Sequence, residues 1–278
     1  MEVFLTMKLW DNHMHCHFSG DSKANPVDMV NHAKQCGLAG ITFTDHLDLD
    51  YLEEPGLFDL DLTSYEEQIH LLSEKEDTAS FFVLCGLELG LQPHLAKEHE
   101  ILLSQYAFDY VIGSTHVVHK RDPYYPAYFE GRSKQEAYRE YYEAVYENLL
   151  AFHDFDALGH LDYVFRYGPK DTAHATPDSY TDYAEILDAI LQFLIAHDIA
   201  LEINTGAFRC GMTEPNPCKK ILQRYHELGG TLITLGADAH KPDDIALGYE
   251  QLPAFLTDCG FYEYMVYQKR IPHPHSLL

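Results

Sequence analysis

Seven short runs of β-branched or apolar residues recur along this chain, and each ends in polar residues of the kinds that bind metals or substrates. The runs end, in chain order, at His15, His46, Glu88, His116, Asp162, Thr205 and His240. Such runs are typical of buried strands. Strands that alternate with helical segments predict a parallel sheet with helices outside, and seven units favour a closed barrel. We therefore predict an α/β fold, a single distorted (β/α)7 TIM-like barrel that forms one domain over residues 1–278.

The segments between these runs carry residues that start and stop helices. An Asn–Pro pair that can begin a helix, with a glycine just past the helix end, occurs twice: at Asn25, Pro26 and Gly37, and at Asn216, Pro217 and Gly229. The spacing of a capping box also occurs twice, at Ser64 with Glu67 and at Ser133 with Glu136. A late apolar run, FYEYMVY at 261–267, is a candidate for one extra strand.

Composition and charge exclude several classes of protein. With 46% hydrophobic and 23% charged residues and no long apolar stretch, the chain is not expected to enter a membrane. Its formal net charge of −25 would repel a nucleic-acid backbone, so DNA and RNA are not expected partners. The first residues do not resemble a secretion signal, and the six cysteines form no CxxC pair. We therefore expect a cytoplasmic protein with reduced thiols; no sequence signal fixes its oligomeric state.

The polar residues at the strand ends predict a metal site. The loops that follow the strands of a β/α barrel form one face, so these residues should meet at a single mouth, the C-terminal ends of the strands. His13 and His15 are two residues apart, which points both imidazoles to the same side of a strand. Two neutral imidazoles with a shared carboxylate bind first-row divalent metals well.

A single HxH motif is a weak signal in a chain with 18 histidines. A specific signal is the ordered set HxH, TDH, GLE, STH, GH and DAH, in which each motif closes a separate strand. Together with segments such as DNHMHCHFSGDS, GITFTDHLDLDY, GHLDYVFRYG and TLGADAHKPDDIA, this set resembles the polymerase-and-histidinol-phosphatase (PHP) superfamily. Within it, the chain is most similar to the monofunctional histidinol-phosphatases of bacterial histidine biosynthesis, from Asp11 to about Gly248.

The resemblance implies a trinuclear centre that holds two to three divalent ions, and a mixture of His, Asp and Glu accepts zinc, manganese or iron. It implies three ligand groups: His13, His15, Glu88 and Asp238; Glu88, His116 and His160; and Asp21, His46 and His240. Glu88 would bridge the first two ions. We interpret His17 as a neighbour of the site and not a ligand, and His119 and His174 as weaker candidates for its border.

The expected chemistry is phosphoester hydrolysis. A carboxylate that bridges two divalent ions leaves a position for a shared hydroxide, which we place at Glu88, because water bound to a metal loses its proton near neutral pH. Several cations would also stabilise the charge that develops on phosphate oxygens. The resemblance implies a small phosphomonoester as the substrate, L-histidinol phosphate, which would be hydrolysed to L-histidinol and phosphate.

Two arginines follow strand-end motifs, Arg166 in GHLDYVFRYG and Arg209 in LEINTGAFR. We interpret both as ligands of the substrate phosphate, because the guanidinium fork matches phosphate oxygens; a surface position or a structural ion pair is the alternative. A protonated guanidinium cannot coordinate a metal, so we expect neither to affect metal retention. Glu202, Asp162 and Asp45 are expected to orient imidazoles or loops through hydrogen bonds.

Four alternative functions are compatible with parts of this pattern. A protein-tyrosine phosphatase or a nucleotide phosphoesterase of the same superfamily would use the same metals. A binuclear amidohydrolase also begins with HxH in a β/α barrel, but it would need a lysine carbamate at the fourth strand, where this chain has GSTH. A non-catalytic metal-binding module is disfavoured because every expected ligand position is filled.

Overall fold

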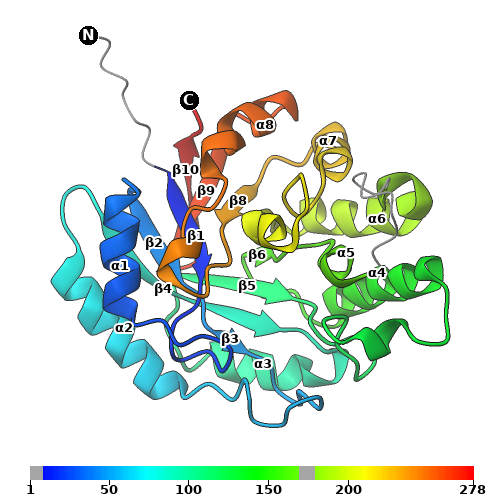
Figure 1. Cartoon of the computed structure of the whole chain (residues 1–278), viewed down its shortest axis with the longest axis horizontal. Helices are drawn as coiled ribbons and strands as arrows, with labels where there is room; N and C mark the ends of the chain where they lie inside the picture. Colours follow the sequence, from blue (N-terminus) through cyan, green and yellow to red (C-terminus); the bar gives the residue numbers. More distant parts are fainter. Residues whose placement is uncertain (1–8, 169–178) are drawn as a thin grey trace.

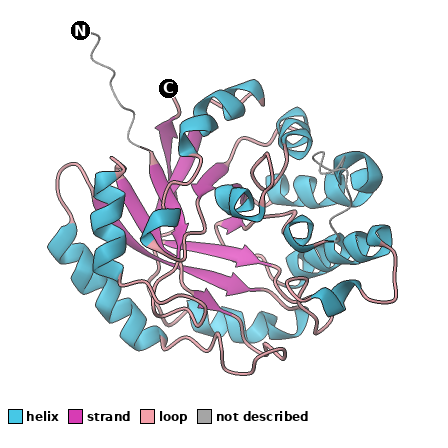
Figure 2. Cartoon of the chain, viewed as in Figure 1, coloured by secondary structure: helices cyan, strands magenta, loops and turns pink. Residues whose placement is uncertain are grey.

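The computed structural model describes residues 9–168 and 179–278. In this part of the chain, parallel strands form a barrel at the centre and helices lie outside it (Figures 1 and 2). The strands are hydrogen-bonded in the order β1 (Trp10–Met14), β2 (Gly40–Phe43), β4 (Phe82–Gly90), β5 (Tyr110–Ser114), β6 (Ala157–Leu158), β7 (Ala200–Asn204) and β8 (Ile233–Gly236). A parallel bridge between Met14 and Ala239 brings the end of β8 to β1 and nearly closes the barrel. The predicted seven-stranded, TIM-like α/β barrel is confirmed.

Three further strands lie off this path. The short β3 (His46–Leu47) follows β2 and pairs with β4, which places His46 beside Glu88. The extra strand expected at 261–267 is β9 (Glu263–Gln268). It forms an antiparallel hairpin with β10 (Ile271–Ser276), so it does not add a strand to the barrel.

The outer layer consists of α-helices and short 3-10 helices. The α-helices are α1 (Pro26–Gln35), α2 (Leu62–Glu76), α3 (Ala96–Leu103), α4 (Lys134–Ala151), α5 (Val164–Tyr167), α6 (Ser179–Ala196), α7 (Lys219–Glu227) and α8 (Leu252–Asp258). The 3-10 helices are η1 (Pro93–Leu95), η2 (Pro126–Phe129), η3 (Thr205–Cys210), η4 (Pro242–Asp244) and η5 (Tyr249–Gln251). No helix in the two described stretches is both long and apolar enough to span a bilayer.

Helix α1 shows how the sequence attaches a helix to the barrel. Asn25 caps its start, with the side-chain oxygen accepting a hydrogen bond from the Val27 amide at 2.8 Å. Met29, Val30 and Ala33 recur at helical spacing and are fully buried. Gly37 follows the helix with a φ of 76°, a conformation that glycine adopts at little cost. The predicted start and stop signals of this helix are confirmed.

Two predicted helix starts are wrong. Helix α2 is capped by Asp61, whose carboxylate accepts from the Ser64 amide at 3.1 Å, so Ser64 lies inside the helix and forms no capping box with Glu67. Helix α7 is capped by Cys218 and not by Asn216. The Asn216 side chain is instead held by polar groups of the candidate site described below.

The other predicted capping box and the other predicted glycine after a helix agree with the structure. Ser133 and Glu136 form a capping box at the start of α4, in which each side chain binds the backbone of the other residue. Gly229, with a φ of 98°, follows the end of α7.

The packing of α1 against the barrel generates a stability prediction. We expect Met29→Ala to lower the free energy of unfolding by about 2–5 kcal/mol, because it leaves a cavity between the helix and the strands. Val27→Ala is the matched control on the same helix; Val27 is 38% exposed, so its loss should change stability by less than about 0.5 kcal/mol. Urea denaturation of both variants measures the difference. Equal effects would mean that α1 does not dock through Met29.

Candidate active site

Glu88 lies at the centre of a cluster of imidazoles at the carboxyl ends of the strands. It is fully buried on β4. Its Oε1 atom is 2.9 Å from His160 Nε2 and 3.2 Å from His116 Nε2, while its Oε2 atom is 3.1 Å from His13 Nε2 and 3.5 Å from His15 Nε2. Oε1 therefore faces imidazoles from the ends of β5 and β6, and Oε2 faces the two imidazoles from the end of β1.

The spacing of these atoms fits coordination around shared centres. In the group of His13, His15, Glu88 and Asp238, the ligand atoms lie 3.1 to 3.9 Å apart. Atoms about 2.0–2.2 Å from one ion in a tetrahedral arrangement lie roughly 3.3–3.6 Å apart. The Nε2 atoms of His13 and His15 face each other at 3.1 Å, an arrangement that a cation between two neutral imidazoles would explain.

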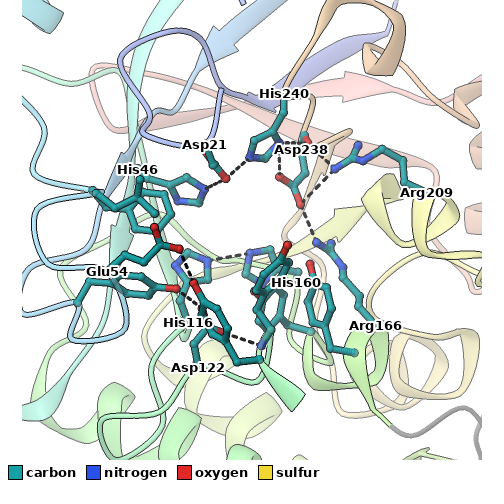
Figure 3. Close-up of a pocket in the computed structure, with 17 residues that line it drawn as sticks. Asp21, His46, Glu54, His116, Asp122, His160, Arg166, Arg209, Asp238 and His240 are labelled. Atoms are coloured by element: carbon teal, nitrogen blue, oxygen red, sulfur yellow. Dashed lines mark hydrogen bonds and ion pairs between the residues drawn. The ribbon is translucent and has the colours of Figure 1, made fainter. Parts of the chain in front are cut away.

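The second and third expected groups are also brought together. The Nε2 atoms of His116 and His160 lie 3.3 Å apart beside Glu88 Oε1. Nearer the mouth, Asp21 Oδ2 is 2.9 Å from His240 Nε2 and 3.7 Å from His46 Nε2 (Figure 3).

His46 joins the third group to the first two. Its Nδ1 atom lies 2.9 Å from Glu88 Oε2, yet both atoms are buried and neither makes an aligned hydrogen bond. Two buried polar atoms that approach without bonding each other fit a divalent ion as the missing partner.

The charges of this cluster compensate one another. Burial alone would raise the pKa of Glu88, but the imidazoles of His13, His46 and His116 outweigh burial and hold the pKa well below its usual range. Burial, reinforced by His240 and His46, lowers the pKa of His15 well below its usual value. Nearby carboxylates raise the pKa of His13, His46 and His116, so these rings must lose protons when an ion binds, because metals bind neutral imidazoles.

Buried carboxylates fix the orientation of the imidazoles through contacts on the side of each ring that faces away from Glu88. Glu202 Oε1 lies 2.5 Å from His13 Nδ1, and Glu202 Oε2 accepts from the His160 backbone amide at 2.8 Å. Asp45 accepts from the Ser19 hydroxyl at 2.8 Å, and that hydroxyl lies 3.1 Å from His15 Nδ1. The predicted orienting roles of Glu202 and Asp45 agree with these bonds.

Asp48 is another such carboxylate, which was not predicted from the sequence. Its Oδ1 atom lies 2.8 Å from His116 Nδ1, so it fixes the ring whose other nitrogen faces Glu88. The signal that could have found it is the spacing in TDHLD, where Asp48 follows His46 by two residues and can point to the same side. Gly90 makes room for this carboxylate, because a Cβ atom at that position would lie 2.0 Å from Asp48 Oδ1.

Arg166 is buried and points toward the metal-ligand cluster. Its guanidinium donates to Asp238 Oδ2, Asn204 Oδ1 and Asn216 Oδ1, each at 2.7 Å. Asp162 supports this arrangement by accepting from the Asn216 amide at 2.5 Å, so its predicted orienting role acts on an arginine partner and not on an imidazole. This ion pair connects Arg166 to Asp238, one of the expected metal ligands, and the sequence did not indicate it.

Arg209 also lies beside Asp238. It donates to the backbone oxygens of Ala237 and Asp238 at 2.7 and 2.6 Å, and its Nη2 atom lies 3.8 Å from Asp238 Oδ2. Figure 3 shows both arginines converging on this carboxylate from one side of the pocket. Each guanidinium carries five N–H groups. Arg166 uses three of its five in these bonds, and Arg209 uses two.

The weaker histidine candidates lie away from this cluster or outside the described residues. His17 is exposed. His119 is also exposed, and its ring nitrogens face Glu140 and Glu147, each at 3.2 Å. His174 lies outside the described residues.

A pocket of about 400 Å³ opens beside the cluster. Asp21, His46, His116, His160, Asp238 and His240 line one part of it, together with Arg166 and Arg209. Much of the rest is aromatic: Tyr51, Phe58, Tyr124, Tyr125, Tyr163 and Tyr167. The pocket thus has polar groups that can bind metals and an anion next to an aromatic wall that can bind an organic group.

Comparisons with known proteins agree with this geometry. The PHP domain family model matches residues 11–206. Histidinol-phosphatase of Lactococcus lactis subsp. lactis is 34% identical over 92% of this chain and 93% of its own length. A protein named probable histidinol-phosphatase, from Clostridium acetobutylicum, is 28% identical over 95% of this chain and 98% of its own.

A solved structure shares the same fold over nearly its whole length. It is the crystal structure of a histidinol phosphate phosphatase from Lactococcus lactis subsp. lactis in complex with zinc, L-histidinol and phosphate. It is 32% identical, aligns with a TM-score of 0.86 and covers 96% of this chain and all of its own. From the family match and the barrel that carries these motifs, the chain belongs to the PHP domain family.

Proposed function

We propose that this protein is a metal-dependent histidinol-phosphatase, a phosphomonoester hydrolase that converts L-histidinol phosphate and water into L-histidinol and phosphate. Relatives with this name are 28–34% identical over most of the chain, and the similar solved structure binds zinc, L-histidinol and phosphate. The observation that carries the proposal is the position of Glu88, whose two carboxylate oxygens face imidazoles from several strand ends. Two of these imidazoles, His116 and His160, line a pocket that two arginines also line.

The ligand assignment follows the three clusters of atoms described above. Two to three divalent ions, zinc, manganese or iron, would be held by His13, His15, Glu88 and Asp238, by Glu88, His116 and His160, and by Asp21, His46 and His240. Clusters of His and Glu that could hold a metal, and the zinc in the similar structure, support divalent metals. When bound, the ions would lower the pKa of a shared water to about 7 and so supply hydroxide beside Glu88.

The remaining residues of the site would bind the substrate phosphate or orient the imidazoles. Arg166 and Arg209 would donate their remaining N–H groups to the substrate phosphate, because a charged fork matches its oxygens. Glu202, Asp48 and the Asp45–Ser19 pair hold the imidazoles in place, so little reorganisation is needed during the reaction.

We further propose that residues 1–278 form a single domain that works in the cytoplasm and binds no nucleic acid. In support, one connected sheet runs from β1 to β8, the six cysteines are unpaired, and the net charge is −25.

A first prediction concerns the metals. The purified protein should contain two to three divalent ions per chain, and prolonged chelation should abolish hydrolysis of L-histidinol phosphate. Added manganese or zinc should restore at least part of the activity. Elemental analysis and phosphate release measure the two quantities, and full activity in metal-free protein would contradict the proposal.

A second prediction concerns the proposed bridge. Glu88→Gln removes one charge with little change of shape, so it should lower the metal content and reduce kcat by at least about a hundredfold. His17→Gln is the control, because His17 is exposed and close in sequence to the ligands. Similar, mild effects of the two substitutions on metal content and on kcat would show that the bridge has been assigned to the wrong residue.

A third prediction separates the two arginines. Arg209→Ala and Arg166→Ala should each lower kcat/KM about tenfold to a hundredfold and weaken inhibition by inorganic phosphate, since a charged hydrogen bond contributes about 1.5–3 kcal/mol. Arg166→Ala should also lower the metal content, because it leaves the Asp238 side chain without its ion pair. Arg209 bonds mainly backbone oxygens there, so its loss should spare the metals. Unchanged phosphate inhibition in either variant would remove that arginine from the phosphate site.

A further inference from the structure

The barrel closes between β8 and β1, where few backbone bonds join the strands. Neighbouring strands elsewhere on the path are joined by ladders of paired residues. In residues 9–168 and 179–278, β1 and β8 share one isolated bridge, between Met14 and Ala239. Side chains of β1 make further bonds across this junction: the Asn12 amide donates to the Leu235 carbonyl on β8 at 3.2 Å. The closure of the barrel thus depends partly on side chains.

Asp11 crosses the same junction with both oxygens of its carboxylate. It lies on β1 and is fully buried. Its Oδ1 atom accepts a hydrogen bond from the Ala237 amide at 2.8 Å, and its Oδ2 atom accepts one from the Ala246 amide at 3.0 Å. Hydrogen bonds to a charged acceptor are stronger than those between neutral groups. One side chain of β1 therefore holds both ends of the segment 237–246, which directly follows β8.

The segment 237–246 contains two of the expected metal ligands, Asp238 and His240. The backbone of Asp238 has a φ of 55°, in the left-handed region that costs free energy for a residue with a side chain. In this conformation its Oδ1 atom lies 3.4 Å from His15 Nε2. Such a conformation persists only where the surrounding structure holds it. Bonds that fix the ends of the segment therefore help to fix the Asp238 carboxylate.

His240 depends on the same segment. Its Nδ1 atom lies 2.9 Å from the Asp238 carbonyl oxygen, and its own carbonyl oxygen accepts from the Ser22 hydroxyl at 2.8 Å. Its Nε2 atom faces Asp21 Oδ2 at 2.9 Å, and Figure 3 shows His240 and Asp238 next to each other in the pocket. A shift of the segment would therefore move a ligand of the first expected group and a ligand of the third together.

From this geometry we infer that Asp11 is a positioning residue, which places Asp238 and His240 for metal binding by holding both ends of the segment 237–246. Backbone amides occupy both of its carboxylate oxygens, so its part is to orient the segment and not to bind an ion. The inference rests on the proposed function and adds a residue to it. A residue that served the barrel core alone would affect stability without a specific effect on metal affinity.

The test measures zinc affinity by competition with a chelator, at a temperature well below unfolding. Asp11→Asn keeps the shape but loses the charge, and its amide nitrogen cannot accept a hydrogen bond. The apparent dissociation constant for zinc should rise about tenfold to a hundredfold, as expected when the support of a ligand is lost.

Asp109→Asn is the matched control. Asp109 also accepts two backbone hydrogen bonds, from the Cys85 and Lys269 amides at 3.1 and 3.0 Å, but it lies just before β5, at the opposite end of the barrel. Its substitution should lower the Tm and leave the zinc affinity unchanged.

The outcomes separate the inference from the proposed function. If the wild type binds zinc and Asp11→Asn binds it equally well, the inference is wrong and the proposed function stands. If the wild type binds no divalent ion, both are wrong. A loss of zinc affinity in Asp109→Asn as large as that in Asp11→Asn would show a general loosening of the fold and would also overturn the inference.

Should Asp11→Asn not fold, hydrogen exchange in the wild type decides. Coupling between two sites is reciprocal, so zinc that binds Asp238 and His240 should also hold the ends of their segment. Zinc should slow exchange of the Ala246 amide, which bonds Asp11, severalfold more than exchange of the Cys85 amide, which bonds Asp109. No greater slowing at Ala246 than at Cys85 overturns the inference.

Discussion

The site depends on one buried carboxylate, Glu88, which faces imidazoles from several strand ends without a hydrogen-bond partner for its Oε2 atom. A charge in that position is tolerable only if cations compensate it, because burial without compensation costs several kcal/mol. The barrel supplies the ligands for such cations by ending its parallel strands at one face. The fold and the metal site are therefore linked, since the same strand order that nearly closes the barrel also brings His13 next to Glu88.

Further buried carboxylates contact the imidazoles on the side that faces away from Glu88. Glu202 and Asp48 each hold the Nδ1 side of a ring whose Nε2 atom faces Glu88, so both rings are oriented before any ion binds. The backbone makes room for them, because a Cβ atom at Gly236 would lie 2.5 Å from Glu202 Oε1. Side-chain freedom at the site is thus restricted by hydrogen bonds that are fully buried.

Much of the fold and of the ligand set could be predicted from sequence, because strand ends in a parallel barrel converge and ligand-type residues stand out there. Local signals failed where tertiary contacts decided the outcome. Asn216 looked like a helix cap, but Arg166 and Asp162 bind its side chain. The bond between Arg166 and Asp238 joins residues far apart in the chain, and no local pattern predicts it.

The central claim is that Glu88 bridges two divalent ions. Anomalous diffraction at the absorption edge of the bound metal, from crystals of the holoenzyme, tests it most directly. We predict two separate peaks, one about 2.0–2.2 Å from Glu88 Oε1 and beside His116 and His160, the other at a similar distance from Oε2 and beside His13 and His15. A map in which Glu88 contacts one ion or none would contradict the account.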